Sequence, residues 1–348
     1  MCPTFRAHDI PIEKVNNEKY VGDIISHNGK HTSNITSRRS KGIGVVNEIV
    51  NILNSLCLGP HYFHVAMTLR QAMLISVLLF NAETWLRLNK SDITKLEKVD
   101  EMLLRKFLKV PTSTPRAALY LETGTIPISF LIKEKRIMFL HHILTRHEDA
   151  LILKVFWVQV SQPAKGDWCT VVDEDMGHIG LQALSFQDVK QMHQGTLRSL
   201  VKKNVVETAF KHLLERKSSL SKLSSLHYDQ LAMQQYLLDP DTTTRHKRLR
   251  FRWRTKMITV NWNYGQKTTC PLCKEHDDTQ DHLLQCPSLQ QVNSHTVGEE
   301  ICIVELERAI RRREVMLEEK KKTKEHPEVY CTTILPSNIQ NKQHTKQP

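Results

Sequence analysis

Four residues of metal-binding type stand close together near the C-terminal end of the sequence, in a C-x2-C-x8-H-x3-C pattern. Two thiols separated by two residues can point at one ion from a tight turn, and Pro271 restricts the backbone of that turn. A single helical turn then brings His282 and Cys286 onto one face. The spacing predicts a tetrahedral zinc site, with zinc as the cofactor and with the ligands Cys270, Cys273, His282 and Cys286.

His276 is a second imidazole close to this pattern, because it follows Cys273 by three residues. Its use as a ligand would leave Cys286 without a partner four residues earlier in the chain. We therefore expect His282 to be the ligand, and whether His276 competes with it stays open. The alternative interpretation is a set of scattered intracellular thiols, which zinc-like spacing disfavours.

Composition limits the class of protein around this pattern. The chain has 348 residues, of which 40% are hydrophobic, which is enough for two or three domains with a buried core. Lys and Arg number 49 against 37 Asp and Glu, so the net charge is +12. A positive balance favours nucleic acid or another polyanion as partner, although charge alone does not choose between them.

The remaining cysteines indicate the compartment. They are an odd and widely spaced set, which argues against a secreted disulfide framework and for a reducing environment: Cys2, Cys57, Cys169, Cys302 and Cys331. The N-terminus is polar, and the longest apolar run, residues 72–80, is too short to span a bilayer. We expect an intracellular protein, nuclear or nucleocytoplasmic, with no membrane partner and no small-molecule substrate.

Hydrophobic periodicity predicts a mainly α protein after a short N-terminal β-hairpin. Residues 18–26 form an apolar run, and Asn28-Gly29 offers a hairpin turn. From Lys41 the period becomes 3.6, and Ser91 is a candidate N-cap. The expected helices cover residues 43–56, 63–80, 92–108, a short segment ended by Gly124, and a long segment after Pro127.

Changes in composition divide the chain into five parts. They are a hairpin remnant at 1–40, a helical bundle at 41–165, a helical connector at 166–262, a small zinc knuckle at 263–290, and a charged helix with a tail at 291–348. Glycines near residue 165 suggest the first boundary within the helical series. We expect residues 299–324 to form a surface helix and residues 327–348 to be disordered.

The most basic stretch lies at residues 245–256, where seven of twelve residues are Lys or Arg. Two aromatic residues lie among the charges, a pattern that suits phosphate contacts together with stacking on unpaired bases. We expect a helix here, and RNA or single-stranded DNA as the partner. The alternatives are a solubilising face on the zinc module or a nuclear import signal. The predicted nucleic-acid-binding residues are Arg245, Lys247, Arg248, Arg250, Phe251, Arg252, Trp253, Arg254 and Lys256.

Four segments, in their order along the chain, resemble the C-terminal half of reverse transcriptases from non-LTR (LINE-type) retrotransposons. They are YVGDIIS at 20–26, the run from NAETWLRLNK to FLHHIL at 81–144, KGDW at 165–168, and CPLCKEHDDTQDHLLQC at 270–286. The resemblance implies that Tyr20-Val21-Gly22 closes the palm, that residues 41–160 form a thumb-like bundle and its continuation, and that a CCHC knuckle follows.

The chain departs from that family in its catalytic residues. Nucleotidyl transfer needs carboxylates that hold two divalent metals, which the family supplies from an upstream aspartate and an aromatic-x-Asp-Asp turn. Asp277 and Asp278 are the only adjacent aspartates, and we expect them to form the solvated loop of the zinc knuckle. We therefore expect no enzymatic activity, but a nucleic-acid-binding fragment of a decayed or truncated element. The alternatives are a zinc-stapled helical protein-interaction module and an inert relic.

Overall fold

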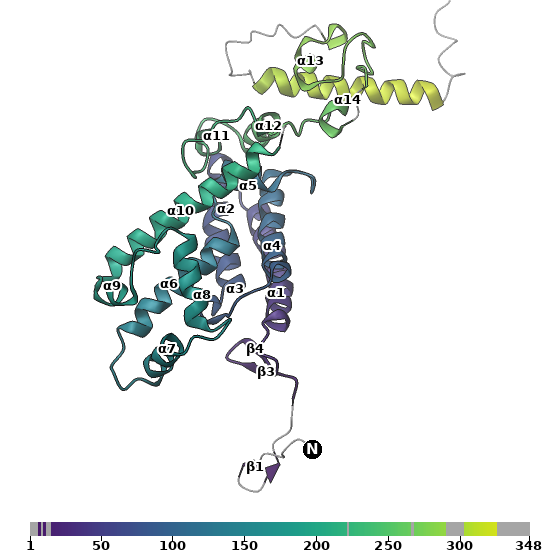
Figure 1. Cartoon of the computed structure of the whole chain (residues 1–348). Helices are drawn as coiled ribbons and strands as arrows, with labels where there is room; N and C mark the ends of the chain where they lie inside the picture. The colour runs from purple at the N-terminus through teal and green to yellow at the C-terminus, as the bar shows by residue number, and fades with distance from the viewer. Residues whose placement is uncertain are drawn as a thin grey trace, which may run out of the picture. The chain divides into compact units, whose positions relative to one another are not determined.

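The computed structural model describes residues 6–7, 10–11, 15–220, 223–265, 268–289 and 303–325. These residues belong to two compact units, one ending at Met257 and the other beginning at Ile258. Both units are built mainly from helices, and short strands lie only at the N-terminal end of the described residues (Figure 1). The predicted mainly α fold class is confirmed.

The first unit contains most of the elements. Its strands are β1 (Arg6–Ala7), β2 (Ile10–Pro11), β3 (Asn17–Tyr20) and β4 (Asp23–Ser26). Its helices are α1 (Thr32–Ser55), α2 (Tyr62–Leu69), α3 (Ser76–Leu78), α4 (Lys90–Leu108), α5 (Arg116–Thr123), α6 (Ile128–Leu144), α7 (Leu151–Ser161), α8 (Trp168–His178), α9 (Phe186–Gln191), α10 (Gln194–Ser218), α11 (Gln235–Leu238) and α12 (Thr244–Arg254). Shorter segments are the 3-10 turns η1 (Gly59–His61) and η3 (Ala82–Thr84) and the π-helical η2 (Arg70–Ile75).

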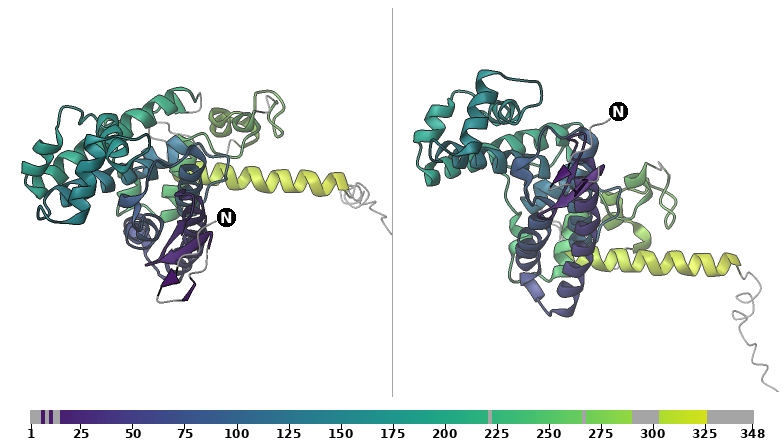
Figure 2. Two further views of the ribbon diagram at one scale, coloured as in Figure 1. Left: turned by 60° about the horizontal axis from the view of Figure 1, so that its bottom comes forward. Right: turned by 90° about the horizontal axis from the view of Figure 1, so that it is seen from below.

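The predicted N-terminal hairpin is present, but its turn is not the predicted one. Strands β3 and β4 pair antiparallel, with Asn17 opposite Ser26. The chain reverses at Val21-Gly22, where both residues have positive φ, the backbone conformation that matches the twist of paired strands. Asn28-Gly29 follows β4 and forms a separate turn. The hairpin lies against the purple helix α1 (Figures 1 and 2).

Two predicted helix starts are wrong. Polar side chains, and not the apolar repeat, determine where these helices begin. Helix α1 begins at Thr32, well before the first apolar repeat, because its N-terminal half packs through Asn34 and Arg38. Both donate hydrogen bonds to the Asp23 carboxylate of the hairpin, at 2.9 and 2.6 Å. Helix α4 is capped by the Asn89 side chain, which accepts from the Asp92 N–H at 2.8 Å, and not by Ser91.

Helix α6 joins two apolar clusters of the first unit. Its residues Ile128 and Ile132 pack with the cluster formed around α1, α2 and α4. Its residues Ile137 and Leu140 pack with the cluster formed by α7, α8 and α10. A helix that is apolar on two faces is buried between layers. Residues 168–178, where glycines suggested a break in the helical series, form α8 within the second cluster.

Close backbone packing requires glycine at one position. Gly124 ends α5 with a φ of +64°, and a Cβ at this position would lie 2.1 Å from the Met233 backbone nitrogen. The segment around Met233 pairs with Thr123 through an isolated bridge. Gly124 was predicted to end this helix, and the structure adds that a second chain segment packs directly on it.

The second unit is small. It contains η5 (Asn261–Tyr264), α13 (Gln280–Gln285), η6 (Pro287–Leu289) and α14 (Ile303–Glu325). Helix α14 packs against α13 and η6. It corresponds to the predicted charged helix, whose first residues, 299–302, lie outside the described residues, as does the predicted disordered tail, 327–348. Within the described part of the chain, no helix has the length and apolar character that crossing a membrane requires.

Candidate metal centre and basic helix

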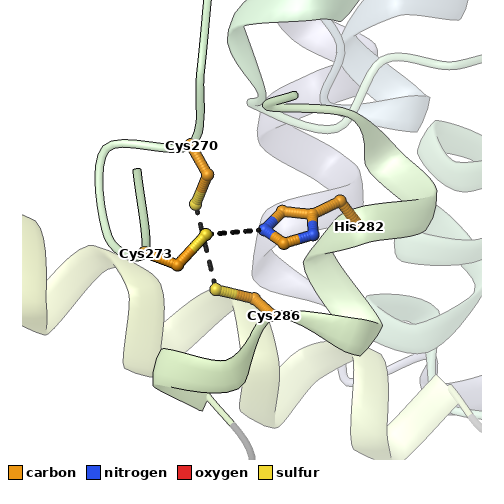
Figure 3. A group of neighbouring side chains, drawn as sticks. All are labelled: Cys270, Cys273, His282 and Cys286. Atoms are coloured by element: carbon orange, nitrogen blue, oxygen red, sulfur yellow. Dashed lines mark hydrogen bonds between the residues drawn. The ribbon is translucent and has the colours of Figure 1, made fainter. Parts of the chain in front are cut away.

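The four predicted zinc ligands converge in the second unit, as Figure 3 shows. Their ligand atoms all lie within 4.8 Å of one another. The Cys273 Sγ is 3.3 Å from His282 Nε2, and the Cys270 and Cys286 Sγ atoms are 3.8 Å apart. Tetrahedral Zn²⁺ with ordinary bond lengths places ligand atoms about 3.5 to 3.8 Å apart. The group therefore fits a metal ion such as zinc.

The backbone around the ligands is formed by local hydrogen bonds. In the cysteine turn, the Cys270 carbonyl accepts from the Lys274 N–H at 2.9 Å, and the Cys270 N–H donates to the His276 carbonyl at 2.7 Å. Thr279 caps α13, its hydroxyl accepting from the His282 N–H at 3.1 Å. The turn places Cys270 and Cys273, as the spacing predicted, whereas α13 carries His282 and ends at Gln285, so that Cys286 is its C-cap.

His276 lies beside the ligand group without belonging to it. Its ring stacks on that of His282, with centroids 5.1 Å apart and planes 7° apart. The side chain is exposed, whereas His282 is buried. The group that could hold an ion contains His282, the ligand preferred from the spacing.

The thiols differ in their readiness to ionise. Burial disfavours the Cys273 thiolate, but hydrogen bonds from the backbone N–H groups of Glu275 and His276 outweigh burial and lower its pKa to about 6. Burial, together with the neighbouring Cys270 and Cys273, raises the pKa of Cys286 to about 11. The lowered pKa favours the Cys273 thiolate before a metal binds, whereas a nearby cation would favour ionisation of Cys286.

The expectation of a solvated aspartate loop is wrong for Asp278. Asp277 is exposed, but Asp278 is 0% exposed. One oxygen of Asp278 accepts from the Asn261 N–H at 2.8 Å and from the Arg313 guanidinium at 2.7 Å. A buried carboxylate is tolerated because a cation and N–H donors replace its lost hydration. No local sequence pattern indicates this role, because Arg313 is 35 residues away.

The basic stretch forms helix α12, as predicted, but much of it packs on the bundle. Three of its cations donate to backbone carbonyls: Lys247 to Pro60 at 2.8 Å, Arg248 to Phe107 at 2.7 Å, and Arg252 to Lys109 at 3.0 Å. Two of these acceptors lie at the C-terminal end of α4, where helix carbonyls lack partners and favour nearby cations.

A fourth cation of α12 neutralises a buried carboxylate. Glu122 on α5 is 0% exposed and accepts from Arg254 Nε at 3.1 Å. It also accepts from the hydroxyls of Tyr228 and Tyr236, at 2.6 and 2.7 Å. Burial and the adjacent Glu122 carboxylate raise the pKa values of both tyrosines, which therefore keep the protons that they donate.

The predicted stacking role of Phe251 is wrong for this conformation. Its ring is 0% exposed and belongs to the first apolar cluster, so it presents no face to a base. Trp253 and Arg250 are partly exposed, whereas Arg245 and Lys256 are exposed. The buried residues Lys247, Phe251 and Thr255 recur every four positions and so share one face, but two of them are polar, so hydrophobic periodicity could not reveal this face.

Comparison of the chain with protein family models, with curated proteins and with solved structures found no match. The fold and the site therefore define the protein by themselves, as a mainly helical protein with a candidate metal centre of three cysteines and one histidine.

Proposed function

We propose that the chain is a zinc-containing protein that binds RNA or single-stranded DNA, similar to the C-terminal part of a non-LTR retrotransposon reverse transcriptase. The observation that carries this proposal is the convergence of Cys270, Cys273, His282 and Cys286 in a chain of net charge +12. Zinc knuckles are recurrent modules for single-stranded RNA, and a positive charge balance supplies the phosphate contacts.

The exposed cations of the basic stretch are the best candidates for phosphate contacts. Four of its seven cations hold α12 on the bundle through the hydrogen bonds described above. Removing these four cations would also break the hydrogen bonds that pack α12, so it would not test phosphate binding alone. Arg245 and Lys256 lie exposed at the two ends of the stretch, where a phosphate backbone can reach them.

Fluorescence polarisation with single-stranded RNA and DNA at several salt concentrations tests the proposal. We expect binding that weakens steeply with salt. Arg245→Gln/Lys256→Gln should reduce the magnitude of the log–log salt slope by about 1.4, that is, by about 0.7 for each lost contact to a single strand. Lys165→Gln/Lys190→Gln removes the same charge from exposed positions elsewhere and should leave the slope unchanged. Absence of binding at low salt would refute the proposal.

We further propose that the chain does not catalyse nucleotidyl transfer. Asp278, one of its two adjacent aspartates, is buried against Arg313 and cannot coordinate a metal from solvent in this conformation. Primer extension with Mg²⁺ or Mn²⁺ should therefore not exceed a control without protein. Extension above that control would contradict this proposal.

The second candidate function is a protein-interaction module, and an exposed apolar face on α7 favours it. The side chains of this face are solvent-exposed on a helix of eleven residues, and Leu151 is 76% exposed. Beside them lies a groove of about 240 Å³, lined mainly by apolar and aromatic side chains such as Phe139 and Trp168. Exposed contiguous apolar surface marks contact sites. The residues of the face are Leu151, Ile152, Val155, Trp157 and Val158.

Crosslinking from α7 tests this second function. Lys154 lies on the same helix. It should crosslink to another protein in an extract with the wild-type chain, and not with Leu151→Asp/Val158→Asp. Equal crosslinking in both chains, or none in either, would count against an interaction through this face.

A further inference from the structure

Helix α14 reaches the metal centre through a buried ion pair. Arg313 is 6% exposed, and its Nη2 donates to Asp278 Oδ2 at 2.7 Å. Asp278 lies immediately before Thr279, the N-cap of α13, and α13 carries His282. The ion pair therefore fixes the backbone from which the histidine ligand projects.

The same helix also contacts the cysteine turn. The Lys320 Nζ donates to the carbonyls of Pro271 and Leu272, at 2.9 and 3.2 Å. These two residues lie between Cys270 and Cys273. Arg313 and Lys320 are seven residues apart, which is about two helical turns, so both project from one face of α14.

Apolar contacts continue this face toward the start of the helix. Leu306 and Ala309 are 0% and 2% exposed, and α14 packs on α13 and η6. In the sequence, Ile303, Leu306, Ile310 and Leu317 form an apolar stripe that marks only part of this face, because the centre of the face is the buried Arg313. The helix thus contacts both segments that supply the ligands.

We infer that α14 is a structural part of the zinc centre, in which Arg313 and Lys320 are positioning residues that raise zinc affinity. This inference rests on the proposed zinc centre. Three thiolates and one Zn²⁺ carry a net charge of −1, so two cations from α14 suit the loaded site electrostatically. Partners beyond the ligands orient them, and changing such partners lowers metal affinity by about 10- to 100-fold.

The two cations should differ in effect. Loss of Arg313 leaves Asp278 buried without its counter-ion, and the other oxygen of Asp278 already has no hydrogen-bond partner among the described residues. Lys320 is exposed, so water can replace its contacts with the two carbonyls. We therefore expect the larger loss of zinc affinity in Arg313→Gln and a smaller one in Lys320→Gln.

Competition with a chromophoric chelator measures zinc affinity in the full chain. Arg313→Gln should weaken it by about 10- to 100-fold. The controls are Arg312→Gln and Lys321→Gln, which remove the same charge from neighbouring positions on α14 and should lie within about twofold of wild type. If Arg313→Gln binds zinc as tightly as Arg312→Gln, the inference is wrong.

A double-variant cycle separates positioning from general misfolding. Asp278→Asn replaces the carboxylate by a neutral amide, so adding Arg313→Gln in this background should cost much less zinc affinity than it does in the wild-type background. Equal costs in both backgrounds would contradict a role through Asp278. Conversely, zinc removal should speed amide exchange in α14, because the coupling between ligand and helix is reciprocal. Unchanged exchange would also contradict the inference.

Zinc stoichiometry distinguishes failure of this inference from failure of the proposed function. A wild-type chain purified without chelator should carry one zinc. A chain without zinc would refute the metal centre itself. One zinc per chain, bound equally tightly by wild type and by Arg313→Gln, would refute only the role of α14.

Discussion

The two units of the protein are stabilised in different ways. The first unit has two apolar clusters, which α6 joins. The second has few buried apolar side chains, among them Leu272, Leu283 and Leu306, around four candidate metal ligands. Small modules bury little apolar surface, and a bound metal can contribute folding free energy that a small core does not supply. The first unit therefore has an extensive apolar core, whereas the second combines a small apolar core with a group of residues that could hold an ion.

Despite this difference, the two units share one structural feature, a buried carboxylate paired with an arginine. Each buries a carboxylate completely and pairs it with an arginine from a helix distant in sequence, Glu122 with Arg254 and Asp278 with Arg313. In the first unit two tyrosine hydroxyls also donate to the carboxylate, whereas in the second a backbone N–H donates to the same oxygen that Arg313 contacts. Basic residues that suggest polyanion binding in the sequence thus serve partly to hold helices in place.

Zinc removal should show the difference in stability between the two units most clearly. A chelator, or Cys273→Ser, should remove on the order of 10 kcal/mol of folding free energy from the second unit, as for small zinc modules. Hydrogen exchange should then lose protection in residues 268–289 and stay unchanged in α4. Simultaneous loss of protection in both units would contradict independent stabilisation.

Breaking a buried ion pair should affect the first unit alone. Arg70 forms a bidentate pair with Asp100, with both N···O distances at 2.7 Å and both residues buried. Arg70→Met leaves an uncompensated buried charge and should destabilise this unit by about 3 to 5 kcal/mol in denaturant unfolding, with zinc content unchanged. Arg70→Met/Asp100→Leu should recover most of the loss. A double variant as unstable as Arg70→Met would disprove this explanation.

The smallest effect concerns the attachment of the hairpin, and it depends on pH. Burial disfavours the Asp23 carboxylate, but hydrogen bonds from Arg38, Asn81 and Asn34 outweigh burial and lower its pKa below the ordinary value of 3.8. The ionised Asp23 carboxylate therefore contributes to the free energy of unfolding above pH 3.8. This contribution is lost as the pH falls through the lower pKa of the folded state.

Asp23→Asn should therefore destabilise the first unit at pH 7 by on the order of 1 kcal/mol, and by progressively less below pH 3.8. Denaturant unfolding at pH 7 and at pH 3 measures the difference. Asp149→Asn is the matched control, because the Asp149 side chain is 83% exposed. A destabilisation by Asp23→Asn that is as large at pH 3 as at pH 7 would show that the carboxylate charge is not its cause.

Local interactions are what the sequence by itself determined. The 3.6-residue period and the end signals predicted the helical fold and the stop at Gly124. The spacing of the four ligands predicted the metal group, because the turn and the helix that bring them together are each formed by nearby residues. Such features depend on neighbours within a few positions along the chain, and the residue types there record them directly.

Long-range pairing is what only the tertiary structure decided. Arg254 meets Glu122 across 132 positions, and Arg313 meets Asp278 across 35. The sequence shows these arginines only as charge, and charge alone is equally consistent with a solvated face, a phosphate contact or a buried ion pair. Which of these occurs depends on whether folding brings a carboxylate or a carbonyl to the same place and removes the water around it. The role of each arginine therefore depends on the packed chain, and local residue spacing does not predict it.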